Sequence, residues 1–215
     1  MSRSIRTAVR AGLVLGVAAA TLLPITASAD TPTAPTGPPS STVAPAPTTI
    51  AGLLAPFATG FDRDNNDFNV AAHLVLQYPQ LVKAAASPGT LTVFLPTDYA
   101  FRRLVREVTG KVVVNETKLL DAVTRLPGLR FEDLIRYHVV KGARITYAIA
   151  RTSDGAFLTT AVGAKVRVSA PKGSNRVTIV DLAPKRRDPR VVRSDWQATN
   201  GVIHVIDAVL LPVAI

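Results

Sequence analysis

The sequence predicts an α+β domain, because helical and strand patterns occupy different halves of the chain. From Phe68 to Ile135, apolar residues recur at the spacing of amphipathic helices. From Phe157 to Val180 the pattern changes to the alternation of half-buried strands. A largely β-branched apolar run then extends from Val202 to Leu211, after the turn signal Asn200-Gly201. This run is too short for a membrane helix and predicts a buried central strand that completes the fold.

The first elements are expected between capping residues and proline stops. Asp67 is placed to cap a helix that Pro79 either ends or interrupts. A short strand is predicted at residues 91–95, because its apolar run stops at Pro96. Thr97 then caps a second helix, whose apolar face contains Phe101.

The remaining elements follow the same logic. Asn115 is expected to cap a third helix that ends at Pro127-Gly128, and Phe131 begins a fourth helix that runs to Tyr137. Beyond this point the period becomes two, which predicts strands at residues 157–160, 164–169 and 176–180.

The first 29 residues have the layout of a secretory signal peptide. Three arginines precede an apolar run from Ala11 to Leu23, and the small residues Ala27-Ser28-Ala29 stand before Asp30. We therefore predict cleavage after Ala29 and a secreted protein that acts outside the cell or at its envelope. A retained membrane anchor is the alternative, but the apolar run is short for a span of about 20 residues.

A stalk is predicted between the signal peptide and the domain. Residues 31–49 are almost entirely Thr, Pro, Ala, Ser and Gly, a composition that cannot bury enough apolar surface to fold. We place a disordered stalk at residues 30–52 and the folded domain at residues 53–215. The stalk would suit O-glycosylation, and an unmodified spacer explains the same composition.

Composition limits the chemistry and favours anionic partners. The absence of cysteine excludes disulfides, a lipid-modified cysteine, thiolate metal sites and a cysteine nucleophile. Without the three arginines of the signal peptide, 22 basic residues face 15 acidic ones, a net charge of +7. Such a chain favours envelope polymers, anionic glycans or nucleic acid, although it contains no nucleic-acid recognition motif.

Three stretches together resemble the fasciclin-like domain family. They are the run LTVFLPTDYAF at residues 91–101, Tyr137-His138 followed by VVKG, and the run NGVIHVID at residues 200–207 with its apolar continuation to Pro212. The resemblance covers about residues 53–213. It implies a wedge of two β-sheets with helices packed against it, in a secreted bacterial single-domain member. It also implies that the motif residues are structural, namely Thr97, Phe101, Tyr137, His138, Asn200, Gly201, His204 and Asp207.

The resemblance extends to two less regular segments. Residues 60–68 are similar to the segment that leads into the first helix of some bacterial members. Residues 188–195 are similar to a long loop that these members have before the final strand. Trp196 departs from the smaller aliphatic residue expected there.

Catalytic and metal sites are not expected. His73, His138 and His204 are the candidates for acid–base chemistry at neutral pH, but a histidine within an apolar motif usually bridges backbone groups. No nucleophile elbow, zinc motif or phosphate loop is present. Asp62 to Asp67 begins like a calcium-binding EF-hand loop, yet Asp67 replaces the required glycine and His73 the bidentate glutamate. We therefore predict no metal, no cofactor and no enzyme.

A basic loop is the candidate contact site for an anionic partner. Three of its cations lie between Pro184 and Pro189, and two follow Pro189. An ordinary solvated loop explains these charges equally well. Arg102, Arg103 and Arg106 would extend the patch. The five candidates are Lys185, Arg186, Arg187, Arg190 and Arg193.

The function expected from these observations is a secreted, non-enzymatic module for adhesion or for contact with the cell envelope or extracellular matrix. Its partner would be an extracellular protein, a glycan or an anionic envelope polymer, with no specific nucleic acid. The resemblance also offers Tyr137-His138 as an adhesion epitope, which burial would exclude. One alternative is a carrier of a small molecule or polyanion in a cleft beside the strands, and another is a hydrolase with an unrecognised site.

Overall fold

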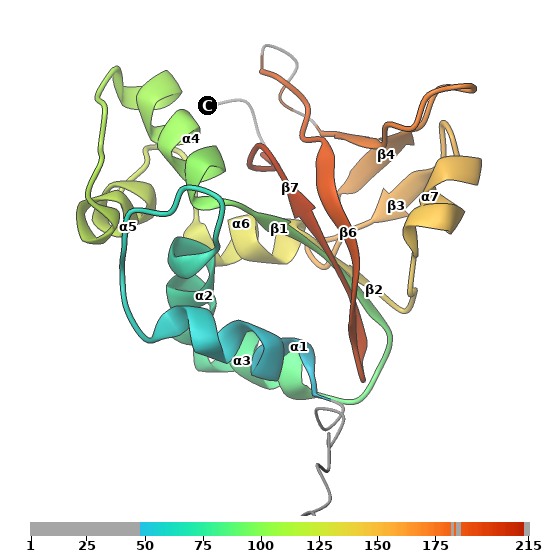
Figure 1. Cartoon of the computed structure of the whole chain (residues 1–215), viewed down its shortest axis with the longest axis horizontal. Helices are drawn as coiled ribbons and strands as arrows, with labels where there is room; N and C mark the ends of the chain where they lie inside the picture. Colours follow the sequence, from blue (N-terminus) through green and yellow to red (C-terminus); the bar gives the residue numbers. More distant parts are fainter. Residues whose placement is uncertain (1–47, 182, 184–185, 213–215) are drawn as a thin grey trace, which may run out of the picture. The chain divides into compact units, whose positions relative to one another are not determined.

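The computed structural model describes residues 48–181, 183 and 186–212, and these residues form the fold in Figure 1. The predicted signal peptide and residues 30–47 of the predicted stalk lie outside them. The α+β class is confirmed, with most helices in the N-terminal half. The helices are α1 (Ile50–Leu54), the 3₁₀ helix η1 (Ala55–Ala58), α2 (Asn69–Leu76), α3 (Pro79–Ala86), α4 (Asp98–Thr109), α5 (Glu116–Thr124), α6 (Phe131–Tyr137) and α7 (Tyr147–Thr152).

The strands form two sheets. They are β1 (Leu91–Pro96), β2 (Val139–Lys141), β3 (Phe157–Thr159), β4 (Lys165–Ser169), β5 (Thr178–Val180), β6 (Val191–Ala198) and β7 (Gly201–Ile206). The larger sheet has the order β2-β1-β7-β6, and the smaller one the order β3-β4-β5. Strands β1 and β7 pair in parallel, whereas the other neighbours are antiparallel.

The C-terminal strand is central, as predicted. Strand β7 lies between β1 and β6, and all six of its residues are buried. It ends at Ile206, earlier than the apolar run, but Leu210 and Leu211 remain buried. Gly201 allows the close approach of β7 to β1, because a Cβ at this position would lie 2.4 Å from the carbonyl oxygen of Leu91.

Asn200 connects the end of this sheet to two helices. Its side-chain oxygen accepts a hydrogen bond from the backbone N–H of Ile50 at 2.9 Å, at the start of α1. Its side-chain nitrogen donates to the carbonyl oxygens of Ala85 and Ser87 at 2.7 and 3.0 Å, at the end of α3. The Asn-Gly turn therefore also holds the N-terminal helices against the sheet.

The two faces of the larger sheet contribute to two hydrophobic cores. Alternate side chains point in opposite directions along a strand, so Val93 and Ile203 belong to the core beneath the helices. Phe94 and Ile206 belong to the core that the smaller sheet covers. Helices α1 to α6 and the smaller sheet occupy separate parts of the fold in Figure 1.

Two predicted helix caps are confirmed and one is wrong. Thr97 accepts from the N–H of Ala100 at 3.3 Å, and Asn115 accepts from the N–H of Lys118 at 3.0 Å. Asp67 does not cap α2, which begins after Phe68. The cap comes from a distant residue, since Asp98 accepts from the N–H of Val70 at 3.1 Å. Pro79 begins α3, so the first helical pattern is a pair of helices.

Three sequence expectations need correction. The predicted domain boundary at residue 53 falls within α1, because the buried side chain of Ile50 already belongs to the core. Helix α7 was not predicted, because its six residues are too few for a clear period. Residues 191–195 are part of β6 rather than a loop, and two register shifts interrupt its pairing with β7. These bulges masked the strand pattern.

None of the helices in the described part of the chain combines the length and the apolar character needed to cross a membrane.

Candidate functional site

The two motif histidines, His138 and His204, are fixed in the core by hydrogen bonds to both nitrogens of each ring. His138 Nδ1 lies 2.8 Å from the carbonyl oxygen of Leu134, and its Nε2 accepts from the N–H of Leu210 at 2.9 Å. His204 Nε2 lies 2.7 Å from the carbonyl oxygen of Ile145, and the N–H of Asp195 approaches its Nδ1 at 3.4 Å. These contacts require one protonated and one unprotonated nitrogen in each ring, so both imidazoles are neutral.

Burial sets the protonation state of both histidines. It lowers the pKa of His138 to about 4, although the hydrogen bond to Leu134 opposes the shift. Burial also lowers the pKa of His204, against the opposing effects of the Ile145 hydrogen bond and the charge of Asp195. Tyr137 is completely buried beside His138. The pair therefore joins α6 to the C-terminal segment and presents no contact epitope.

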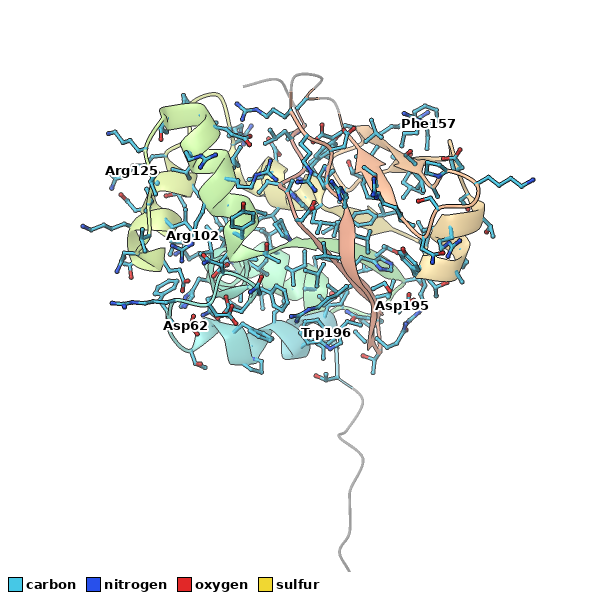
Figure 2. The ribbon with its side chains drawn as sticks, turned by 45° about the horizontal axis from the view of Figure 1, so that its top comes forward. Asp62, Arg102, Arg125, Phe157, Asp195 and Trp196 are labelled. Carbon is cyan, nitrogen blue, oxygen red and sulfur yellow. The ribbon has the colours of Figure 1, made fainter. Side chains whose placement is uncertain are left out.

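The remaining motif residues are also engaged within the fold. Phe101 is buried in the helix-side core, and Thr97 caps α4. Asp207 accepts from the backbone N–H of Arg190 at 2.8 Å. Trp196 packs against Phe57 and Phe68, with ring centroids 5.8 and 5.9 Å away, and so forms part of an aromatic cluster (Figure 2).

The predicted basic loop is not a group of free cations. Arg186 pairs with Glu107 at 2.9 Å, and Arg187 pairs with Asp207 at 2.6 Å. Arg193 is exposed on β6 and is not part of the loop. Lys185 lies outside the described residues. Two of the predicted cations are therefore already neutralised by partners within the chain.

Two of the arginines of α4, Arg102 and Arg103, are paired as well. Arg103 lies 3.1 Å from Glu107, the residue that also binds Arg186, so α4 and the basic loop are neighbours. Arg102 binds Glu116 at 2.8 Å. Arg103 and Arg186 share the partner Glu107, and the carboxylates reduce the charge of the combined surface.

A second basic surface, not anticipated as a site, covers the outer face of the smaller sheet. Phe157 pairs directly with Arg167, and Thr159 pairs with Lys165, so these four side chains share one face. All four are exposed, and Phe157 is 65% exposed. Figure 2 shows Phe157 at the outer edge of the domain. We call Phe157, Thr159, Lys165 and Arg167 the outer basic face.

Arg190 adds to this face from the neighbouring segment. Successive cross-strand pairs place Ser169 opposite Thr178, and Thr178 opposite Arg190. Directly paired residues point to the same side of a sheet, so Arg190 lies on the side of Arg167. One of the predicted cations thus belongs to the outer basic face. The alternation of Lys165 and Arg167 with buried Val166 and Val168 is the sequence signal for it.

An acidic cluster joins the segment before α2 to the start of α5. Oxygens of Asp62, Asp67 and Glu116 lie within 4.8 Å of one another, the one such grouping among the described residues. Glu116 is already neutralised by Arg102 and also accepts from the N–H of Asp62 at 2.9 Å. These contacts hold the segment before α2 against α5, which is a structural role for the cluster.

A shared proton links the cluster to Asp98. Asp98 Oδ2 and Asp67 Oδ1 are both buried without another hydrogen-bond partner, and the two carboxyl groups interact closely enough to share a proton. Burial, followed by the hydrogen bond and the charge of Asp67, raises the pKa of Asp98 to about 9. Asp98 is therefore neutral at physiological pH, and its other oxygen caps α2 through Val70.

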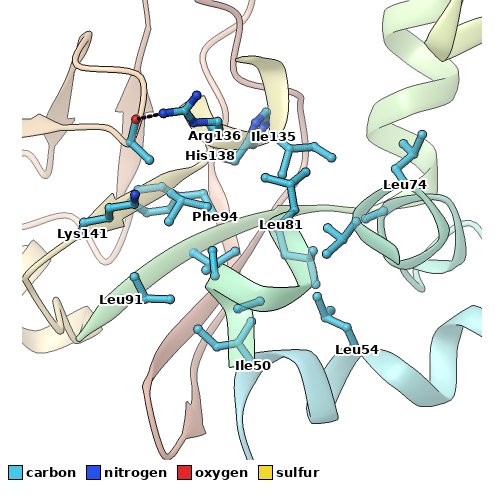
Figure 3. Close-up of a pocket in the computed structure, with 18 of the residues that line it drawn as sticks. Ile50, Leu54, Leu74, Leu81, Leu91, Phe94, Ile135, Arg136, His138 and Lys141 are labelled. Carbon is cyan, nitrogen blue, oxygen red and sulfur yellow. Dashed lines mark hydrogen bonds between the residues drawn. The ribbon is translucent and has the colours of Figure 1, made fainter. Parts of the chain in front are cut away.

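A large apolar cavity lies on the helix side of the larger sheet (Figure 3). Its volume is about 640 Å³, within the range of small-molecule binding sites. The walls come from α1, α2, α3, α6, β1 and β2. They include the side chains of Leu54, Leu74, Leu81, Phe131 and Ile135. Sequence reasoning offered a cleft beside the strands as an alternative, but it named none of these residues, because the cavity depends on how separate helices sit over the sheet.

The fold of this chain is also found in a solved structure. The fold is shared with the FAS1 domain pair of the insect cell adhesion molecule Fasciclin I, with a TM-score of 0.55 and 19% sequence identity. The match covers 76% of this chain and 51% of the Fasciclin I chain. The fasciclin domain profile matches residues 66–212, and the chain belongs to the fasciclin domain family.

Relatives in the family range from bacterial to human proteins. Protein sll1483 of Synechocystis sp. is 30% identical over 173 residues, which cover 80% of this chain and 81% of that protein. Human periostin is 26% identical over 132 residues, which cover 61% of this chain but 13% of periostin. This chain therefore matches one small part of the large animal protein.

Proposed function

We propose that the protein is a secreted, non-enzymatic adhesion module that binds an anionic polymer of the cell envelope or extracellular matrix. The single observation that carries this proposal is the outer basic face, where Lys165 and Arg167 share one side of the sheet with the exposed Phe157. Membership of a family that includes a cell adhesion molecule supports it. The predicted signal peptide and the net positive charge support it as well.

The outer basic face fits an anionic polymer better than the basic loop does. Neither Lys165 nor Arg167 lies within 4.0 Å of a carboxylate among the described residues, whereas Arg186 and Arg187 both do. An unpaired cation can release its counterions on binding, which gives affinity and a strong dependence on salt. The Phe157 ring offers an apolar platform for a sugar ring or an aromatic group beside these charges.

Binding to isolated cell envelope across a salt series tests the proposal. The double variant Lys165→Gln/Arg167→Gln should lose about tenfold in affinity and show a shallower dependence on salt. The matched control Lys111→Gln/Lys118→Gln removes the same charge from exposed positions around α5 and should bind like the parent chain. Phe157→Ala should weaken binding at all salt concentrations.

Two results would contradict the proposal. Equal loss in both double variants would mean that net charge, rather than the outer basic face, governs binding. Loss in Arg186→Gln/Arg187→Gln, with none in the Lys165/Arg167 variant, would move the contact to the basic loop.

A further inference from the structure

We propose that the apolar cavity is a binding site for a long-chain amphiphile with an anionic head group, of the fatty acid type. This site is separate from the outer basic face and does not depend on the adhesion function. The cavity lies between α3 and α6, and the strands β1 and β2 form part of its wall.

The lining excludes strongly polar ligands. The interior walls consist mainly of aliphatic and aromatic side chains, among them Leu54, Leu74, Leu81 and Phe131. A sugar or nucleotide in such a space would lose its hydrogen bonds to water without replacement. Apolar cavities of this kind remain poorly hydrated and take up apolar molecules. The body of the ligand must therefore be hydrocarbon.

His138 belongs to the lining and does not change this conclusion. Both of its ring nitrogens are engaged by backbone groups of Leu134 and Leu210. Burial lowers its pKa, so the ring carries no charge at neutral pH. It therefore contributes a neutral ring edge and leaves the interior without a histidine cation to attract a polar group.

The basic groups of the lining, Arg136 and Lys141, lie to one side of the cavity. In Figure 3, Arg136 and Lys141 occupy one side, and Leu54 and Leu74 lie on the opposite side. Lys141 is exposed and has no carboxylate within 4.0 Å among the described residues. A cavity that is basic on one side and apolar on the other matches an amphiphile. The anionic head group would bind at Arg136 and Lys141, and the chain would extend towards the leucines.

Arg136 is positioned to receive a carboxylate. One guanidinium nitrogen donates to the carbonyl oxygen of Ala161 at 3.1 Å, which fixes the side chain at the edge of the cavity. The other terminal nitrogen lies 3.9 Å from Glu132, a long and partly exposed ion pair. A ligand carboxylate can replace this weak partner and bind the guanidinium in a two-pronged manner. Lys141 supplies a second positive charge.

Fluorescence titration of the full chain with a polyene fatty acid and its methyl ester tests the site. The parent chain should bind both probes saturably. Ala84→Phe places a ring on the cavity wall from the exposed side of α3 and should weaken both probes at least about tenfold. The control Ala86→Phe adds the same ring to α3 outside the lining and should bind like the parent.

A second pair of variants tests whether the head group of the ligand binds near Lys141. Lys141→Gln should weaken the fatty acid several-fold and leave the methyl ester unchanged, because only the acid is charged. Lys83→Gln, an exposed position on α3 outside the lining, should affect neither probe. Equal weakening of acid and ester by Lys141→Gln would overturn the assignment of the anionic head.

Transfer from vesicles distinguishes the two sources of such a ligand. Uptake of the free acid from buffer, without uptake of acyl chains from phosphatidylglycerol vesicles, identifies a free fatty acid. Uptake from vesicles identifies a membrane lipid. Absence of saturable binding by the parent chain, or equal binding by Ala84→Phe and Ala86→Phe, would overturn the proposed site. Melting temperatures of the variants show that any loss is not a loss of folding.

Discussion

The two faces of the larger sheet are packed in different ways. On the side covered by the smaller sheet, Phe94, Ile206 and Leu210 interlock with Val166 and Val168. A small cavity there, lined by Phe94, Val168 and Ile179, has a volume of about 10 Å³, close to the size of one water molecule. On the helix side, a cavity of about 640 Å³ lies between α3 and α6. One sheet therefore has a closely packed face and a face with room for a ligand.

This difference separates scaffold from candidate site. Interiors normally contain few voids larger than a water molecule, so the face under the smaller sheet is typical of a core. The cavity on the helix face departs from this rule, and its walls come from short helices whose positions are set by caps and turns. We infer that the sheet-to-sheet side provides most of the rigidity, and that the helix side is where a ligand is accommodated.

The largest expected effect is a difference in stability between two truncations, one on each face of the larger sheet. Ile206→Ala should lower the free energy of unfolding by roughly 4 kcal/mol, because it leaves a cavity in the closely packed core. Leu81→Ala should cost about 1.5 kcal/mol, because one side of Leu81 already faces the cavity. Urea unfolding measures both values. Equal losses would show that the two faces are packed alike.

The next largest effect is the pH dependence of stability that His138 causes. This residue links Leu134 of the helix-side core to Leu210 of the core under the smaller sheet. Its folded-state pKa of about 4 lies below the ordinary value of 6.5, so the unfolded chain takes up a proton first as the pH falls. Stability is complete above pH 6.5 and should decrease by roughly 3 kcal/mol as the pH falls through about 4. Unfolding curves at several pH values measure this loss.

His138→Gln is the matched variant for that pH dependence. It should be less stable at neutral pH, because it disturbs the hydrogen bonds to Leu134 and Leu210. Its stability should also depend less on pH between 6.5 and 4. An unchanged slope would mean that His138 is protonated within the folded protein at pH 6, contrary to the two hydrogen bonds described.

Asp98 gives a smaller effect with the opposite dependence on pH. Its folded-state pKa of about 9 lies above the ordinary value of 3.8, so its contribution is complete below pH 3.8 and is lost as the pH rises through 9. Asp98→Asn keeps an oxygen for Val70 and a donor for Asp67, and it has no proton to lose. The variant should be more stable by about 1 kcal/mol at pH 8. A less stable variant at this pH would contradict the shared proton.

The smallest effect is expected at the surface. Arg186→Gln breaks the ion pair with Glu107, whose side chain is partly exposed and also contacts Arg103. Exposed ion pairs contribute little, so the melting curve should shift by the equivalent of about 0.5 kcal/mol or less. A loss above about 2 kcal/mol would show that the basic loop supports the fold rather than lying on its surface.

Local patterns predicted much of the fold. Thr97 and Asn115 each combine a capping side chain with a following amphipathic pattern, and both begin helices where expected. The C-terminal run was recognisable because β7 is buried on both faces and its residues are therefore almost all apolar. The α+β class followed from the change of period.

Features that depend on contacts between distant residues were not predictable. Asp98 caps α2 from the start of α4, across 28 positions of sequence, so no local motif signals it. Asp195 adopts a positive φ of 60° and accepts from the N–H of Tyr147 at the start of α7, which local patterns do not show either. The cavity is the extreme case, because each of its walls looks like an ordinary apolar helix face.

The most direct test of the difference between the two faces adds volume to each of them. Ala85→Leu extends a side chain into the cavity from α3, and Ala150→Leu extends one into the closely packed core from α7. We predict that urea unfolding without ligand will show Ala85→Leu as stable as the parent chain or more so, and Ala150→Leu less stable by about 2 kcal/mol. Similar destabilisation by both substitutions would contradict an open cavity on the helix side.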